Sequence, residues 1–488
     1  MKNSCILLAA SMIAACPGAS AQTPIFGQRT YTGLYTYNHA DLNRTGRESL
    51  IYHTQTSGFA VVLSTGPGTY AAPVDYNVPD NQPSGTITLD INNDSFPDVI
   101  AFNSSAPGFY EYLNNGDGSL HLQSTYQMAN IQDMVVGDFN HDGYPDIAFT
   151  TLDGNLHVWF NNHASGFSVG PTTTVPGTWQ LSIGDFDGDG KADIAATGSN
   201  GTYLYFGDGA GHFAVVNATT SHHPYMFLMD IDGDGKSDLV GAAIAGSSSG
   251  NNTYYRDLWV VYGNSSRTIT EADIPLNGYV MPWQDGYVLG EATPSVDVAD
   301  FNGDGKRDFA VVEALDSDGY GGRTLAVKSG NGNRTWADEV NVYSDNNLDA
   351  GVAALRVEHS LKPDLLVDTF LNPSTFTAHF FINDTSGGYY GGCDFPSEAS
   401  AIAICSPETY SSSPQSWKLS GAVPTTMRKM EIWVDGVKKY QEIGNHDFGH
   451  YGVLDTTLTL SSGTHKVTVI AAGYDNLEVK DTLTVSVP

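Results

Sequence analysis

Short apolar runs alternate with polar turns along most of this chain. The stretch 181–216 is typical, because four runs of apolar or alternating residues follow one another with short polar connections between them. Strand patterns of this length joined by short turns predict antiparallel meanders. We therefore expect an all-β protein. The four runs of this stretch are Leu181–Phe186, Ala192–Thr197, Thr202–Phe206 and His212–Val216.

The same pattern repeats at a nearly constant interval. An acidic loop follows the first run of each unit, and successive loops begin 48, 47, 45 and 70 residues apart. A period of 40–50 residues indicates a propeller or a solenoid, and four strands per unit is the size of one propeller blade. Degenerate copies around Asp41 and Asp364 extend the series to seven units.

The acidic loop has nine residues and a fixed order of side chains. Oxygen ligands occupy positions 1, 3, 5 and 9, and four of the five regular loops have Gly at position 6, where Asp90–Asp98 has Ser95. Hard oxygen ligands around a tight turn suit Ca²⁺, so we expect about five calcium ions with a structural role. The predicted ligands are Asp90, Asn92, Asp94, Asp98, Asp138, Asn140, Asp142, Asp146, Asp185, Asp187, Asp189, Asp193, Asp230, Asp232, Asp234, Asp238, Asp300, Asn302, Asp304 and Asp308, with a degenerate set at Asp41, Asn43 and Thr45.

An EF-hand is the competing calcium motif. It requires a Glu at position 12 of its loop and flanking helices. Position 12 is Phe149, Ala196, Gly241 or Val311 in the four loops with Gly at position 6. EF-hands are therefore excluded.

These loops carry a family resemblance. The repeated Asp-Phe-Asn/Asp-Gly-Asp-Gly-Lys-x-Asp motif, with a turn such as Phe206-Gly-Asp-Gly209 after the third strand, resembles the FG-GAP/VCBS repeats of integrin-α-like propellers. The resemblance covers residues 28–392. It implies a seven-bladed β-propeller with Ca²⁺ in the loop between the first two strands of a blade.

The period ends before residue 415, and residues 415–488 contain other short β-patterns. Asp435-Gly436 between two strand patterns predicts a hairpin. The segment resembles bacterial Ig-like domains, which implies a small β-sandwich. Residues 393–414 form the predicted linker, and we expect a disulfide between Cys393 and Cys405 in an exported chain.

The N-terminus predicts export. Residues 1–21 resemble a signal peptide that ends in Ala19-Ser20-Ala21. The alternative is a lipobox ending at Cys16, which would anchor the chain through a lipid. No other apolar run approaches the length of a transmembrane span. We expect a secreted or cell-surface protein, and its net charge of -32 argues against nucleic-acid binding.

The clearest insertions fall on one side of the predicted propeller. In a four-stranded meander, the metal loops lie on one face, and the second-to-third and blade-to-blade connections lie on the other. The insertions Gly246–Asp257, Pro275–Ser295 and Leu315–Arg323 belong to the second face. Long loops on a rigid scaffold concentrate binding, although aromatic residues there could equally cap an enlarged blade. The candidate ligand-binding residues are Tyr254, Tyr255, Tyr279, Trp283 and Tyr287.

The function favoured by the sequence is a calcium-stabilised binding or adhesion protein that recognises a glycan or a surface protein. A secreted polysaccharide lyase or hydrolase and a purely structural envelope component remain the alternatives. No catalytic residue is predicted. Ser168 fits G-x-S-x-G but begins a strand rather than a strand-to-helix turn, and His446 and His450 lie in a loop of the Ig-like segment.

Overall fold

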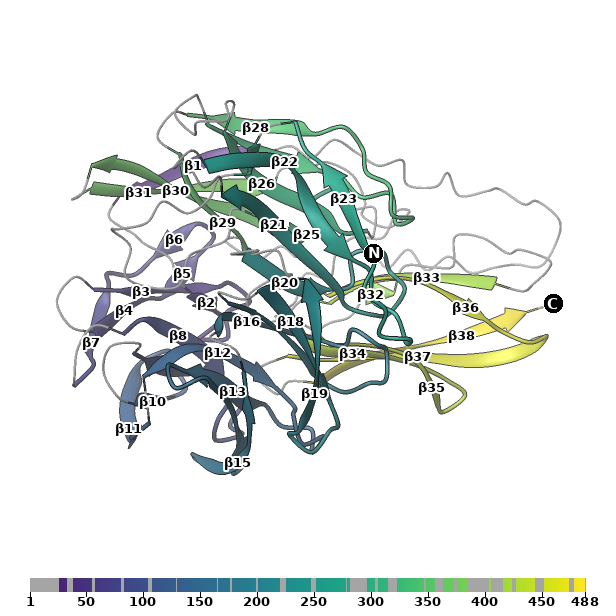
Figure 1. Ribbon diagram of the computed structural model, residues 1–488, viewed down its shortest axis with the longest axis horizontal. Coiled ribbons are helices and arrows are strands. Elements are labelled where there is room, and N and C mark those ends of the chain that lie inside the picture. Colours follow the sequence, from purple (N-terminus) through teal and green to yellow (C-terminus); the bar gives the residue numbers. More distant parts are fainter. Residues whose placement is uncertain are drawn as a thin grey trace.

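The structure is a computed structural model of the chain. Its described part consists of strands and turns (Figure 1). Among the residues described, no helix is long and apolar enough to cross a membrane. The described residues are 26–32, 38–54, 58–79, 83–103, 108–128, 130–164, 166–175, 178–198, 201–219, 225–246, 252–277, 279–280, 296–302, 306–314, 323–345, 348–355, 363–372, 375–383, 403–404, 416–423, 427–443, 452–473 and 478–487.

Seven antiparallel sheets, here called blades 1 to 7, follow one another along the chain. Each is a meander, as the alternation of apolar runs and turns predicts. Blade 1 contains β2 (Asn38–Ala40), β3 (Ser49–His53), β4 (Gly58–Val62) and β7 (Val74–Asn77), with a small hairpin of β5 (Ser64–Gly66) and β6 (Thr69–Tyr70) before β7. Blade 2 contains β8 (Gly85–Leu89), β9 (Asp98–Phe102), β10 (Phe109–Asn114) and β11 (Leu120–Tyr126). Blade 3 contains β12 (Ile131–Gly137), β13 (Asp146–Thr151), β14 (Asn155–Asn161) and β15 (Phe167–Thr174). Blade 4 contains β16 (Thr178–Gly184), β17 (Asp193–Gly198), β18 (Gly201–Gly207) and β19 (Phe213–Thr219).

The later blades are larger. Blade 5 contains β20 (Tyr225–Met229), β21 (Asp238–Gly246), β22 (Asn252–Val261) and β23 (Glu271–Pro275). Blade 6 contains β24 (Tyr279–Val280), β25 (Val296–Ala299), β26 (Asp308–Ala314), β27 (Arg323–Lys328) and β28 (Val340–Ser344). Blade 7 contains β29 (Leu348–Leu355), β30 (Asp364–Asn372), β31 (Thr375–Asn383) and, from the N-terminal part of the chain, β1 (Phe26–Thr32).

Strand β1 closes the ring. It pairs antiparallel with β31, from Phe26 opposite Asn383 to Thr32 opposite Thr377, and Figure 1 shows the purple strand beside the green ones. The predicted propeller begins at residue 28, and the structure places residues 26–32 in the seventh blade. Local periodicity cannot reveal this pairing, because its two strands are about 350 residues apart.

The core lies between the blades. Every pair of neighbouring blades shares a cluster of buried apolar side chains. Blades 1 and 7 meet through Leu50 and Val62 on one side and Leu355 and Leu366 on the other. Since the seventh interface joins the last blade to the first, the sheets form a closed seven-bladed ring. This confirms the predicted propeller.

Hydrogen bonds also link the first strands of neighbouring blades. The Leu181 N–H donates to Asp133 Oδ2 at 2.6 Å, and the Ala354 N–H donates to Asp297 Oδ2 at 2.6 Å. These bonds connect blade 3 to blade 4 and blade 6 to blade 7. A buried backbone N–H without a partner is costly, so the acidic side chains satisfy backbone groups at the inner edges of the sheets.

The residues after the propeller form two antiparallel sheets that share one core. Met430, Ile432, Val467 and Val469 of one sheet pack in the same cluster as Leu458 of the other. The predicted hairpin is confirmed, since Asp435 and Gly436 join two paired strands with φ of 52° and 80°. One sheet contains β32 (Ala403–Ile404), β33 (Ser416–Val423) and β36 (Gly452–Thr459), and the other contains β34 (Met427–Val434), β35 (Val437–Ile443), β37 (Gly463–Gly473) and β38 (Glu478–Val487).

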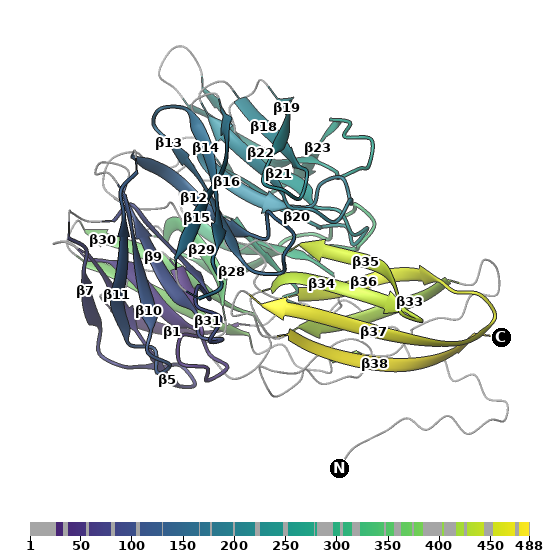
Figure 2. The same cartoon turned by 90° about the horizontal axis from the view of Figure 1, so that it is seen from below.

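We call this unit the C-terminal domain. Strand β32 lies inside the segment predicted to be the linker, so part of that segment belongs to the domain. Figure 2 shows the C-terminal domain beside the propeller, with its edge strand β35 on the side nearest to β16 and β20.

Candidate metal centres

The acidic loops join the first and second strands of the blades, and those of blades 1 to 5 fold around their first aspartate. In blade 4, the Asp189 and Gly190 N–H groups donate to the two carboxylate oxygens of Asp185 at 3.1 and 2.8 Å. One carboxylate therefore holds the loop in a tight curl. The same two bonds form at Asp41, Asp90, Asp138 and Asp230.

The curl requires left-handed backbone at two positions. Position 6 has a positive φ, as the Gly there predicts, and Ser95 adopts it with φ of 69°. Position 4 also has a positive φ, which the sequence reasoning missed. It is 73° at Gly188, 63° at Asn93 and 62° at His141. Non-glycine residues rarely occupy this region, and Asn and His are among those enriched there.

The last aspartate of the loop connects it to the third strand of its blade. In blade 4, Asp193 accepts hydrogen bonds from Phe186 N–H at 2.9 Å and from Gly207 N–H at 2.9 Å. We call this pair of bonds the closing contact. It ties the loop to the end of β18. The bond to the third strand recurs at Asp98, Asp146, Asp238, Asp308 and Asp364, and in blade 1 Ser49 takes the same place by accepting from Ser64 N–H.

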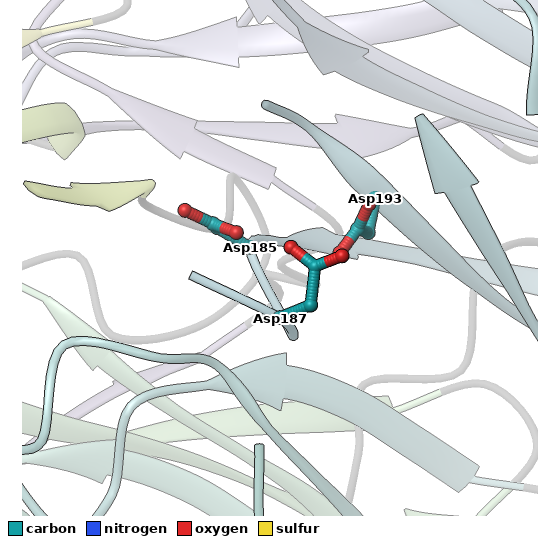
Figure 3. Close-up of side chains that lie close together, drawn as sticks. All are labelled: Asp185, Asp187 and Asp193. Atoms are coloured by element: carbon teal, nitrogen blue, oxygen red, sulfur yellow. The ribbon is translucent and has the colours of Figure 1, made fainter. Parts of the chain in front are cut away.

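Two of the loops bring three carboxylates together. Oxygen atoms of Asp185, Asp187 and Asp193 lie within 4.8 Å of one another, and so do those of Asp230, Asp232 and Asp238. Figure 3 shows the Asp187 and Asp193 carboxylates directed toward each other, with Asp185 beside them. These are positions 1, 3 and 9 of the loop, which the sequence predicts to be ligands.

Burial of these carboxylates disfavours their charged form and raises their pKa values. Burial, with smaller contributions from Asp187 and Asp185, raises the pKa of Asp193 to about 8, and burial raises the pKa of Asp185 to about 7. Burial likewise raises the pKa of Asp98 and Asp146 to about 8, assisted by other carboxylates of their loops. Crowded, buried carboxylates become stable as anions when a divalent cation lies among them. The donor set, all oxygen, therefore fits Ca²⁺.

Arginines from the next blade approach only the two loops that have Asp at position 3, among the contacts of the described residues. Arg267 of blade 5 forms an ion pair with Asp187 at 2.6 Å, and Arg334 of blade 6 forms one with Asp232 at 2.5 Å. Loops with Asn at position 3 use the amide instead, as Asn140 does when it donates to Asp142 at 2.9 Å.

Both arginines occupy a turn position that needs left-handed backbone. Their φ values are 56° and 62°, and the equivalent turns of blades 2 and 4 have Gly118 and Gly211 there. Each guanidinium also lies over an aromatic ring, at 4.3 Å for Arg267 over Phe206. These ion pairs could therefore be recognised in the sequence. The signal is an Arg at the turn position that is Gly in blades 2 and 4, one blade after a loop with Asp at position 3.

Three loops are less complete. In blade 6, Asp300, Asn302 and Asp308 are buried, whereas Asp304 lies outside the described residues. In blade 1, Asp41 is the only carboxylate among the alternating positions, and Thr45 donates to Asn43 at 3.1 Å. In blade 7, Asp364 retains its bond from Asn383 N–H at 2.8 Å.

The C-terminal domain lies against the metal-loop face. Gln441 of β35 donates to the Gly190 carbonyl at 2.9 Å, and Ile443 packs against the apolar cluster shared by blades 3 and 4. A cleft of about 210 Å³ remains next to the loop of blade 3, lined by residues that include Asp138 and Asp142 from the propeller and Lys429 from the C-terminal domain. This contact was not predicted from the sequence.

Three of the five candidate ligand-binding residues lie in strands rather than in loops. Tyr254 and Tyr255 belong to β22, because the insertion in blade 5 lengthens the β21–β22 hairpin. Tyr279 belongs to β24, which pairs with β26. Assigning these three residues to loops was therefore wrong, since an insertion can extend a ladder as readily as a turn. Trp283 and Tyr287 lie outside the described residues.

The remaining candidates of the sequence are Ser168 and residues outside the described part of the chain. Ser168 lies in the exposed fourth strand of blade 3 and donates to the Phe160 carbonyl at 3.3 Å, as expected for a strand residue. The signal peptide with Cys16, the pair Cys393 and Cys405, and the pair His446 and His450 all lie outside the described residues.

Comparison with known proteins agrees with the repeat. The model of the FG-GAP-like repeat family matches residues 90–149, 138–196 and 185–241. The chain therefore contains FG-GAP-like repeats in blades 2 to 5. A comparison with curated proteins gives no match.

Several solved structures are similar to the chain at low identity. A lectin of Agrocybe aegerita described as recognising non-reducing terminal N-acetylglucosamine is 18% identical, over 74% of this chain and 86% of that one, with a TM-score of 0.44. BBS1N, solved in complex with ARL6DN, is 12% identical over 74% of this chain and 98% of that one, with a TM-score of 0.48. A Lactobacillus plantarum protein is 17% identical over 67% and 88%, with a TM-score of 0.39. The fold assignment rests on the sheets of this chain itself.

Proposed function

We propose that this chain is an exported binding protein, stabilised by calcium, that recognises a glycan or a surface protein. Its recognition surface is the propeller face opposite the metal loops, around the long hairpin of blade 5. The proposal rests on a difference between the two faces of the ring. The C-terminal domain contacts the metal-loop face, whereas the long hairpin of blade 5 extends toward the opposite face.

The metal-loop face is engaged by the chain itself. Gln441 and Ile443 of β35 contact blades 3 and 4 on that face. A binding site for an external ligand is therefore better accommodated on the opposite face.

The long β21–β22 hairpin of blade 5 extends toward that opposite face. Its central strands β21 and β22 have 9 and 10 residues, against 6 and 7 for β17 and β18 of blade 4. Gly246 still pairs with Asn252 at the far end of the ladder. A paired hairpin is a rigid support for recognition residues, and rigidity lowers the entropic cost of binding.

Calcium supports this function by stabilising the scaffold. The loops of blades 4 and 5 each bring three carboxylates together and are held by arginines of the following blade. Ca²⁺ would neutralise the crowded carboxylates and keep the ring in one shape. The ion is therefore a structural partner rather than a bridge to ligand.

The test is binding of the full chain to a glycan array and to intact cells, with Ca²⁺ and with a chelator. The variant Tyr254→Ala/Tyr255→Ala should lose most of the binding, and Tyr144→Ala on the metal-loop face serves as the aromatic control. Equal loss in both variants would contradict the assignment of the recognition face. Cleavage products from a polysaccharide would favour the lyase or hydrolase instead, and no binding at all would favour the structural component.

A further inference from the structure

The contact between the C-terminal domain and the propeller is centred on the metal loop of blade 5. Tyr440 of β35 donates its hydroxyl to Asp230 Oδ2, the first carboxylate of that loop, at 3.1 Å. The ring of Tyr440 lies so close to Gly235 that a Cβ there would be 2.8 Å from it. Gly235 has a φ of 85°, and Tyr440 leaves no room above it for a larger residue, whereas Ser95 occupies the same position in blade 2.

Arg307 of the blade 6 loop completes the contact. Its Nε donates to the Asp230 carbonyl at 3.1 Å, and its guanidinium forms an ion pair with Glu442 of β35. The side chains of Arg307 and Glu442 are only 6% and 4% exposed, so this pair is shielded from water. One arginine thus joins two consecutive metal loops and the C-terminal domain.

With its carboxylates ionised, this contact carries more negative than positive charge. Its carboxylates are Asp230, Asp232, Asp234, Asp238 and Glu442. The cationic side chains paired with them are Arg307, Arg334 and Lys236. The described pairs therefore leave an excess of two negative charges, which is the charge that one divalent ion supplies.

We propose that a divalent cation bound in the loop Asp230–Asp238 holds the C-terminal domain against the propeller through Tyr440 and Glu442. Docking brings one more carboxylate to a buried acidic loop. Burying unpaired like charges is unfavourable, so the docked arrangement is stable when the loop is loaded and weak when it is empty. The inference rests on calcium binding as proposed above, but not on any external ligand.

The coupling must act in both directions. If the ion favours docking, then docking must favour the ion by the same factor. Tyr440→Phe removes only the hydroxyl, which lies within hydrogen-bond distance of Asp230 and of Glu442. It should weaken Ca²⁺ binding at one site by about 5- to 10-fold, within the usual range of coupling between sites. The other loops keep their affinity, because they do not contact this hydroxyl.

The experiment is hydrogen–deuterium exchange of the full chain, with saturating Ca²⁺ and with a chelator, alongside calorimetry of Ca²⁺ binding. Chelation should increase exchange about tenfold in a peptide covering Val437–Ile443, while a peptide of the β37–β38 ladder changes little. Tyr440→Phe should show fast exchange of the same peptide even with Ca²⁺. Lys439→Gln, an exposed neighbour on the same strand, is the matched control.

A second variant separates repulsion from general unfolding. Glu442→Gln removes the extra carboxylate while keeping an acceptor for Arg307, so chelation should release β35 less than in the wild type. Unchanged exchange at Val437–Ile443 upon removal of calorimetrically detected Ca²⁺ would overturn the coupling and leave the calcium sites intact. Absence of any Ca²⁺ binding would overturn both proposals, and a Lys439→Gln effect equal to that of Tyr440→Phe would overturn the role of the hydroxyl.

Discussion

The loops of blades 4 and 7 occupy the same place in their sheets but differ in charge. The blade 4 loop has four aspartates at alternating positions, and three of them form a buried cluster. The equivalent segment of blade 7 has lost most of these residues but retains Asp364, preceded by Pro363. Yet Asp193 and Asp364 accept the same backbone hydrogen bond from the end of their third strands.

This difference separates two roles of one residue. The last aspartate of the loop lies among other carboxylates, so it could bind a metal. It also accepts a hydrogen bond from the backbone of the third strand. Blade 7 keeps the second role without most of the ligands that would accompany the first. The bond to the third strand is therefore part of the blade itself, and the cluster of carboxylates is an addition to it.

The largest expected effect comes from removing the metal from every loop at once. An ion that binds only the folded protein stabilises it by about 2.7 kcal/mol at a concentration 100 times its dissociation constant. Chelation should therefore lower the melting temperature by on the order of 10 °C. Scanning calorimetry with Ca²⁺ and with chelator measures this change. Mg²⁺ added back after chelation is the control for general ionic effects, and full recovery with it would contradict a preference for Ca²⁺.

A pair of variants then divides the two roles. Asp193→Ala and Asp364→Ala each leave a buried N–H without its acceptor, at a cost of about 1–3 kcal/mol. In the presence of Ca²⁺, Asp193→Ala should lower the free energy of unfolding by more than Asp364→Ala does, because it also removes a ligand. In chelator the two losses should become similar, as measured by urea unfolding. If Asp364→Ala is as sensitive to Ca²⁺ as Asp193→Ala, blade 7 binds metal after all.

The stability of the fold should depend on pH in the absence of metal, and much less in its presence. Burial raises the pKa of Asp98, Asp146 and Asp193 to about 8, far above the value of about 4 in an unfolded chain. The metal-free fold therefore binds more protons than the unfolded chain between about pH 4 and 8, and its stability falls as pH rises through that window. We expect the melting temperature in chelator to decrease by several degrees from pH 5 to pH 8.

With saturating Ca²⁺ the same carboxylates stay ionised, so the decrease should largely disappear. A parallel fall in both conditions would indicate that other groups control the pH response. Asp98→Asn in chelator is a matched check, because it removes one of the groups with a raised pKa and should make the curve less steep.

The smallest expected effect concerns the arginine that faces the blade 4 loop. Arg267 is 38% exposed, so solvent screens its ion pair with Asp187. Arg267→Gln should destabilise the metal-free protein by no more than about 1 kcal/mol. With Ca²⁺ the loss should be smaller still, since the ion already compensates Asp187. Lys191→Gln, which removes an exposed partner of Asp189, is the control, and a larger loss in Ca²⁺ than in chelator would contradict compensation.

Much of the fold could be predicted from the sequence because its determinants are local. The alternation of apolar runs and turns encodes each meander, and the loops from Asp90 to Asp308 mark the period. The curl at position 6 could also be predicted, because Gly accepts a left-handed backbone without a steric penalty. The need for the same backbone at position 4 could not, because Asn93, His141 and Gly188 share no obvious residue type.

The chain by itself determined its repeating blades, the acidic residues of their loops and the number of units, since each is encoded by residues close together in the sequence. Only the tertiary structure decided which distant groups meet. It brought β1 to blade 7, Arg267 to Asp187 and Tyr440 to Asp230. The physical reason is that these contacts depend on ring closure and on docking of a second domain, and neither leaves a periodic signal in the sequence.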